Sequence, residues 1–227
     1  MLLSEFLSPL TKSFLFTFGT LLPFLNPPAI APIFLSMTEN ASPDTRLMLA
    51  KKVASNVAIM LVATLLIGNA ILALFGISLP IVRLGGGTLI IFSAWNLITS
   101  SDEGKSIVDE KQELMSLEQA NSRAFYPLTF PVAFGPGAIS GAIAVGIYLI
   151  ESTNSINTIT MKLSGSVLAI LLLSSILYIC MKFSAQMLNK LGRSGTTVFM
   201  KLSSFIMLCL GVQICWAGVN ELVRTFL

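Results

Sequence analysis

Long apolar stretches separated by short polar segments dominate the chain. A helix needs about 20 mostly apolar residues to cross a bilayer. Six stretches of the chain reach that length, at 13–36, 53–75, 80–99, 125–150, 163–188 and 199–223. The second has no charged residue between Val53 and Phe75. The pattern predicts an all-α integral membrane protein with six transmembrane helices.

Two of these stretches contain similar interruptions. The first reads Asn26-Pro-Pro-Ala-Ile-Ala, and the fourth reads Gly135-Pro-Gly-Ala-Ile-Ser. The third and sixth stretches also open alike, with Arg83-Leu-Gly-Gly and Lys201-Leu-Ser-Ser, at nearly the same spacing along the chain. This order predicts a duplicated three-span unit. Because three is odd, the second copy must enter the membrane from the other side, as in the inverted repeats of secondary transporters.

The predicted organisation is one structural domain built from two halves. Residues 1–99 form the first three-span repeat, and residues 125–227 form the second, inverted one. The segment 100–124 is rich in Asp and Glu, which predicts a polar cytoplasmic linker with a short amphipathic helix around Glu110–Asn121. Lys and Arg concentrate after the first, third and fifth spans, so these loops should face the cytoplasm and both termini the periplasm.

The interruptions predict broken helices. Proline has no N–H group and disfavours helical geometry in the residue before it. Breaks are therefore expected near 26–28 and 135–137, each followed by a new helix with free N–H groups and a positive dipole end. Asn26 is a candidate cap for the first new helix. Two such ends, pointing in opposite directions, predict binding of one small anion such as a carboxylate; packing kinks without a ligand are the alternative.

The candidate substrate-binding residues come from the two breaks and from one polar residue in each of the third and sixth spans. They are Asn26, Pro27, Pro28, Ala29, Ile30, Gly135, Pro136, Gly137, Ala138, Ile139, Ser140, Asn96 and Gln213. Arg83 is a candidate gate or anion partner, the alternative being a long side chain that reaches the membrane interface.

Composition narrows the class of function. Hydrophobic residues make up 54% of the chain and charged residues 11%, against about 25% charged residues in average soluble domains. This excludes an ordinary soluble domain and a nucleic-acid binder. The chain has no His and no P-loop motif, so neither His-based catalysis nor ATP drive is supported; we expect no enzymatic activity and no resident cofactor or metal. With no Asp or Glu well inside a span, Na⁺ held by unwound carbonyls is a chemically easier coupling ion than H⁺.

The motifs resemble the MarC family of bacterial inner-membrane proteins over nearly the whole chain. The resemblance rests on Leu22-Pro-Phe-Leu-Asn-Pro, Phe75-Gly-Ile-Ser-Leu-Pro, Gly135-Pro-Gly-Ala-Ile and Gly211-Val-Gln. It implies six spans, an inverted repeat and, in some members, transport of small neutral amino acids. The sequence departs from the family at Lys201-Leu-Ser-Ser, where Arg-(Ile/Leu)-Met-Gly is expected. The function expected is a secondary transporter of a small carboxylate-bearing solute in the bilayer, as a monomer or homo-oligomer; a channel or a non-transporting scaffold is the alternative.

Overall fold

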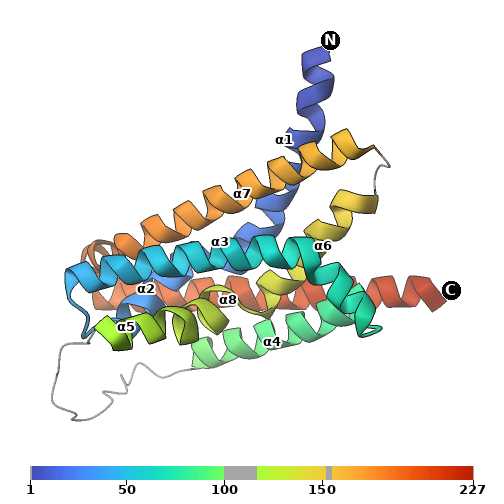
Figure 1. Cartoon of the computed structure of the whole chain (residues 1–227). Helices are drawn as coiled ribbons and strands as arrows, with labels where there is room; N and C mark the ends of the chain where they lie inside the picture. Colours follow the sequence, from blue (N-terminus) through green and yellow to red (C-terminus); the bar gives the residue numbers. More distant parts are fainter. Residues whose placement is uncertain (1, 100–116, 152–154, 227) are drawn as a thin grey trace.

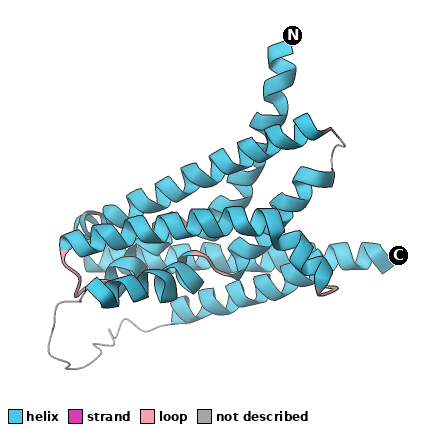
Figure 2. Cartoon of the chain, in the orientation of Figure 1, coloured by secondary structure: helices cyan, strands magenta, loops and turns pink. Residues whose placement is uncertain are grey.

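The computed structural model describes residues 2–99, 117–151 and 155–226, and within these ranges it contains helices and no strands (Figure 2). The elements are α1 (Leu2–Leu25), α2 (Pro27–Met37), α3 (Pro43–Leu74), α4 (Leu79–Thr99), α5 (Leu117–Arg123), the irregular segment η1 (Ala124–Ala133), α6 (Pro136–Glu151), α7 (Ile156–Lys182) and α8 (Ser184–Phe226). Within η1, Tyr126 and Phe130 have extended rather than helical backbone angles.

Several of these helices are long and apolar enough to cross a membrane. Four candidate spans lie in the described residues, at Pro9–Met37, Pro43–Leu74, Ile156–Lys182 and Ser204–Arg224. A fifth is added if Glu118–Ala133 and Pro136–Leu149, which are bent by 70° relative to each other, form one broken span. The third predicted stretch, 80–99, is helical as α4, with 21 residues, but is not one of these candidate spans.

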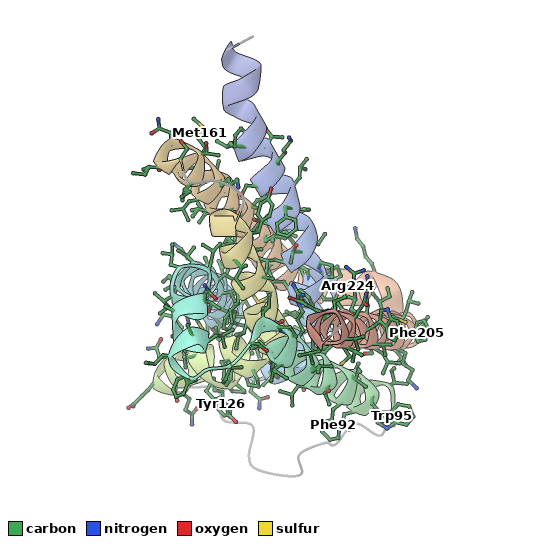
Figure 3. The ribbon with its side chains drawn as sticks, turned by 90° about the vertical axis from the view of Figure 1, so that its right-hand side faces the viewer. Phe92, Trp95, Tyr126, Met161, Phe205 and Arg224 are labelled. Atoms are coloured by element: carbon green, nitrogen blue, oxygen red, sulfur yellow. The ribbon has the colours of Figure 1, made fainter. Side chains whose placement is uncertain are left out.

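The helices pack in pairs. The helix α4 runs along α8, α1 packs on α7, and α3 lies against both α6 and α7 (Figure 1). The buried core between them is aliphatic, with Leu61, Leu173 and Leu177 almost inaccessible. Large apolar side chains also lie on the outside, where Phe92, Trp95 and Phe205 are more than half exposed and point away from the bundle (Figure 3). Soluble proteins rarely present such large apolar surfaces, whereas a lipid-facing surface does.

Two glycines let helix backbones approach closely. A side-chain carbon added at Gly165 of α7 would lie 2.3 Å from the carbonyl oxygen of Leu10 in α1. One added at Gly146 of α6 would lie 2.3 Å from the carbonyl oxygen of Leu65 in α3. Small residues at such crossings are the usual means by which membrane helices pack.

Part of the predicted linker is a packed helix. Residues 100–116, including most of the helix expected around Glu110–Asn121, lie outside the described residues. The rest forms α5, which contacts η1 and α3. Ala120 is fully buried, and Lys52 of α3 donates a hydrogen bond to the side chain of Asn121. The helix α5 thus touches the bundle through Ala120, while the other described residues of the helix remain exposed.

The predicted loop before the sixth span is also helical. The helix α8 begins at Ser184 and continues through 188–199 to Phe226. Gly192 interrupts it with a left-handed φ of 67°. The chain between the fifth and sixth predicted spans is therefore the kinked first part of α8.

Candidate functional site

A cavity of about 360 Å³ lies where the interruption between α1 and α2 faces the interruption between η1 and α6. Its walls come from these elements and from α4 and α8. Its lining residues are Pro23, Phe24, Leu25, Asn26, Ala29, Ile30, Ile33, Leu89, Ile90, Asn96, Pro131, Val132, Gly135, Pro136, Gly137, Ala138, Ser204, Met207 and Leu210. Only Asn26, Asn96 and Ser204 bring polar side chains. A mostly apolar cavity of this size with a few polar groups is typical of a small-ligand site.

The start of α2 offers no free N–H group. Asn26 adopts a left-handed conformation (φ 36°, ψ 60°) before the helix. The first two helical residues, Pro27 and Pro28, have no N–H, and the next two, Ala29 and Ile30, donate to the backbone oxygen of Asn26 at 2.9 and 3.2 Å. The expectation that the Asn26 side chain caps α2 is wrong, since it makes no capping hydrogen bond. The paired prolines explain this, because they remove a donor that a cap would bind.

The end of α1 instead leaves hydrogen-bond acceptors. In an α-helix the carbonyl of residue i accepts from the N–H four residues later. For Pro23 and Phe24 those residues are Pro27 and Pro28, which have no N–H to donate. Both carbonyls therefore lack a helical donor at the C-terminal end of α1, and both residues line the cavity. The first interruption therefore places hydrogen-bond acceptors beside the cavity.

The start of α6 provides hydrogen-bond donors. Its first residue, Pro136, has no N–H, and Ile139 donates to the carbonyl oxygen of Gly135 at 3.1 Å. Among the described residues no group accepts from the backbone N–H of Gly137 or Ala138. Both residues line the cavity. The positive end of the α6 dipole is also there, and helix starts of this kind bind anions.

Glycines hold the start of α6 against α1 and α4. A side-chain carbon at Gly137 would lie 2.2 Å from Cδ1 of Ile90 and 3.1 Å from Cδ1 of Phe24. One at Gly141 would lie 2.8 Å from the Phe24 ring. The Phe24 side chain thus packs directly on α6, so that the two interruptions face each other across the cavity.

The arrangement suits a small molecule with a negative and a positive group. Carbonyl oxygens at the end of α1 and the amide oxygen of Asn26 can accept hydrogen bonds from an ammonium group or bind a cation. The N–H groups at the start of α6 can donate to a carboxylate. The expectation that two helix starts converge on one anion is therefore wrong in one half: α6 presents donors, whereas the prolines of α2 leave it none.

The structure brings together most of the predicted site residues. The cavity is lined by Asn26, Ala29, Ile30, Asn96, Gly135, Pro136, Gly137 and Ala138. The others lie outside that lining: Pro27 is buried, Pro28 is exposed, Ile139 packs on the core, Ser140 is buried beside Gly86, and Gln213 is exposed on α8. Gln213 thus does not share the position of Asn96, although the two are nearly equivalent in the aligned halves.

Some lining residues were not foreseen as site residues. Ser204 of α8 and Ile90 of α4 both face the cavity. The alignment of Arg83-Leu-Gly-Gly with Lys201-Leu-Ser-Ser pairs Ser204 with Gly86, which does not line the cavity, so the repeat gives no signal for Ser204. Apolar residues such as Ile90 also carry no signal, because nothing in the sequence distinguishes a residue that faces a cavity from one that faces lipid.

Arg83 has a partner within the chain. Its guanidinium group forms an ion pair with the carboxylate of Glu221, which joins α4 to α8. The side chains are 28% and 42% exposed, and Arg83 does not line the cavity. The predicted role as an anion partner is thus taken by a protein carboxylate, and the pair holds the edge of the α4–α8 contact.

Removing this ion pair should have a small effect on stability. For Arg83→Gln or Glu221→Gln we expect a loss of about 0–1 kcal/mol, because partly exposed ion pairs are screened by solvent. Thermal unfolding of the purified variants would measure it. If Arg83 were instead the main substrate partner, Arg83→Gln would abolish ligand-induced stabilisation, while Glu221→Gln would leave it intact.

Several known membrane proteins are similar to this chain over most of its length. The chain is 29% identical to a UPF0056 membrane protein of Archaeoglobus fulgidus, over 92% of this chain and 93% of that one. It is 26% identical to the UPF0056 inner membrane protein MarC of Escherichia coli, over 91% and 93% of the two chains. A similar match, 26% over 91% and 96%, is found with a UPF0056 membrane protein of Methanocaldococcus jannaschii. No solved structure matches significantly. The model of the MarC family of integral membrane proteins matches residues 11–223, and the chain belongs to that family.

Proposed function

We propose that the protein is a secondary transporter of a small neutral amino acid, or of a similar small solute with a carboxylate, and that it works by alternating access to the central cavity. The observation that carries this proposal is the opposition of acceptors at the end of α1 to donors at the start of α6. A zwitterion needs both kinds of group. An amino acid with a short side chain fits the small, mostly apolar cavity.

The proposal includes an inverted repeat of two three-span halves. Its support is the sequence similarity of the two interruptions and the way the helices pair. On this assignment α1 with α2 corresponds to η1 with α6, α3 to α7, and α4 to α8. The contact of α1 with α7 is then equivalent to that of η1 with α3, and the contact of α2 with α7 to that of α6 with α3. The contact between α4 and α8 maps onto itself. Transporters with such repeats bind their substrates at broken helices between the halves.

We further propose that the protein lies in the inner membrane, as its Escherichia coli relative is named to do, with both termini on the periplasmic side. The bias of Lys and Arg toward alternate loops supports this orientation. For ion coupling we favour Na⁺, since the carbonyls of Pro23 and Phe24, which have no helical N–H donor, are ligands that suit a hard cation.

The first experiment is ligand-induced thermal stabilisation of the purified protein. A ligand that binds the native state raises the melting temperature by mass action. We expect alanine, glycine or serine to raise it, and analogues without the carboxylate or without the amine to fail. Repeating the series in Na⁺ and K⁺ buffers tests the coupling ion. Saturable counterflow in proteoliposomes then separates a carrier from a channel, and stabilisation by neither amino acids nor other carboxylates would favour a scaffold.

Asn26 allows its side chain to be tested apart from its backbone. Asn26→Gly keeps the left-handed conformation, which glycine adopts without strain, but removes the amide. We expect this variant to fold normally and to lose most of the stabilisation by amino acids. Leu35→Ala, in the same helix but outside the cavity, is a control for loss of side-chain volume. If amino acids stabilised Asn26→Gly as much as the wild type, the side-chain amide of Asn26 would not contribute to binding.

A further inference from the structure

A second cavity, of about 340 Å³, lies between α3 and α7 and shares no lining residue with the first. The two helices lie side by side in opposite directions (Figure 1). Each presents residues at helical spacing, so that one face of each helix lines the groove. The lining residues are Lys51, Ala54, Ser55 and Ala58 of α3 and Leu171, Ser174, Ser175 and Tyr178 of α7.

The polarity of the groove changes along its length. Charged residues of α3 are confined to its first turns, and none follows between Val53 and Leu74. Lys51 therefore lies where the polar end of the helix meets its apolar part. Because the helices are antiparallel, Tyr178 lies at the Lys51 end and Leu171 at the Ala58 end, about 10 Å away along α3. One end of the groove is basic, and the other is apolar.

Two polar groups of the groove lack partners. The ammonium group of Lys51 forms no ion pair or hydrogen bond with any residue that the structure describes, whereas the neighbouring Lys52 donates to Asn121. Ser174 is only 6% exposed, and within the described chain its hydroxyl has no hydrogen-bond partner. The hydroxyl of Ser175, in contrast, donates a hydrogen bond to the carbonyl oxygen of Leu171. A buried hydroxyl without a partner costs free energy that a bound ligand can recover.

We propose that this groove binds one anionic glycerophospholipid. The order of groups matches such a molecule at three levels: Lys51 for the phosphate, the Ser174 hydroxyl for an ester carbonyl, and Ala58 with Leu171 for the first part of an acyl chain. Basic pockets between membrane helices bind acidic lipid headgroups. The lining contains no Asp or Glu to hold the ammonium of a zwitterionic headgroup, so charge complementarity favours a lipid with net negative charge.

The test uses native mass spectrometry of the full chain in detergent, titrated with phosphatidylglycerol or phosphatidylcholine. We expect one preferential phosphatidylglycerol site, weakened about fivefold by Lys51→Gln, the effect typical of one lysine near an anionic lipid. Lys52→Gln is the matched control, since Lys52 faces Asn121 rather than the groove, and it should bind like the wild type. Glycerol phosphate, the headgroup without acyl chains, should not compete; competition would assign the site to a free anion and overturn the proposal.

A second variant blocks the apolar end. Ala58→Phe fills the groove from a partly exposed position, and should reduce binding of phosphatidylglycerol while leaving the melting temperature near the wild-type value. Equal lipid binding in the wild type, Lys51→Gln and Ala58→Phe would overturn the proposal. So would a dimer that Ala58→Phe dissociates without any change in lipid binding, because the groove would then be an interface between two copies. None of these results depends on whether the central cavity transports a solute.

Discussion

Replacing Pro27 and Pro28 together by alanine is expected to abolish transport while leaving the protein folded and inserted. The substitution supplies two N–H groups to the carbonyls of Pro23 and Phe24, which have no helical donor in the native chain. Asn26 can then leave its left-handed conformation, and α1 and α2 join into one helix. Alanine is favoured over proline by about 3 kcal/mol per residue inside a helix. The acceptors that face the cavity are lost in the same step.

The measurement is uptake of radiolabelled alanine, serine or glycine into proteoliposomes, together with the melting temperature of the variant. We expect a melting temperature equal to or above that of the wild type, with no uptake. Pro32→Ala is the matched control: Pro32 lies inside α2, is buried and does not line the cavity, so uptake should persist. Normal uptake by the double variant would show that the interruption is only a packing kink.

Gly146→Ala is expected to destabilise the bundle strongly. Among the glycines that lie neither at the cavity nor at the α1–α7 crossing, we expect this replacement by alanine to have the largest effect. The added carbon would lie 2.3 Å from the Leu65 carbonyl oxygen and 3.3 Å from its carbonyl carbon. Both are backbone atoms, so no side chain can rotate away and α6 must move from α3. Overpacking of this kind costs about 1–3 kcal/mol, which corresponds to a fall of about 2–12 °C in melting temperature.

The matched control is Gly85→Ala in α4, where the added carbon has no neighbour within 4 Å. There alanine should stabilise slightly, by about 0.5–1 kcal/mol, because it restricts the unfolded chain more than glycine does. Thermal unfolding of both variants in the same detergent gives the comparison. Equal melting temperatures would contradict the close α3–α6 approach.

The sequence predicts the helical class and most of the cavity, because these depend on local chemistry. Apolar length indicates the spans. Asn26 and Gly135 are marked by the motifs Asn-Pro-Pro and Gly-Pro-Gly, whereas single prolines such as Pro23 and Pro32 are accommodated inside helices. Even the loss of donors at α2 could have been deduced, since it follows from the two prolines alone.

Other features depend on which helices are neighbours in the fold, and the local sequence pattern does not predict these neighbours. Arg83 has the same residue type and position whether it faces a ligand or Glu221, and only the α4–α8 pairing decides. Gln213 matches Asn96 in the aligned halves but lies on the exposed face of α8. The charged residues of α5 are exposed, and its contact with the bundle depends on a single buried alanine, Ala120, which the sequence pattern does not single out.

The pairing of α4 with α8 limits how the cavity can open. At their crossing, a carbon added at Gly87 would lie 2.8 Å from the carbonyl oxygen of Gly211, and one added at Gly218 would lie 2.8 Å from that of Pro80. Backbone atoms in such contact cannot rotate aside as side chains can, and the Arg83–Glu221 ion pair also joins the two helices. The two helices should therefore move as one rigid body. Both also contribute cavity-lining residues, so this body is a single wall of the cavity. Under the transport function proposed above, it is the tilt of this wall against α6 that would expose the cavity to one side of the membrane at a time.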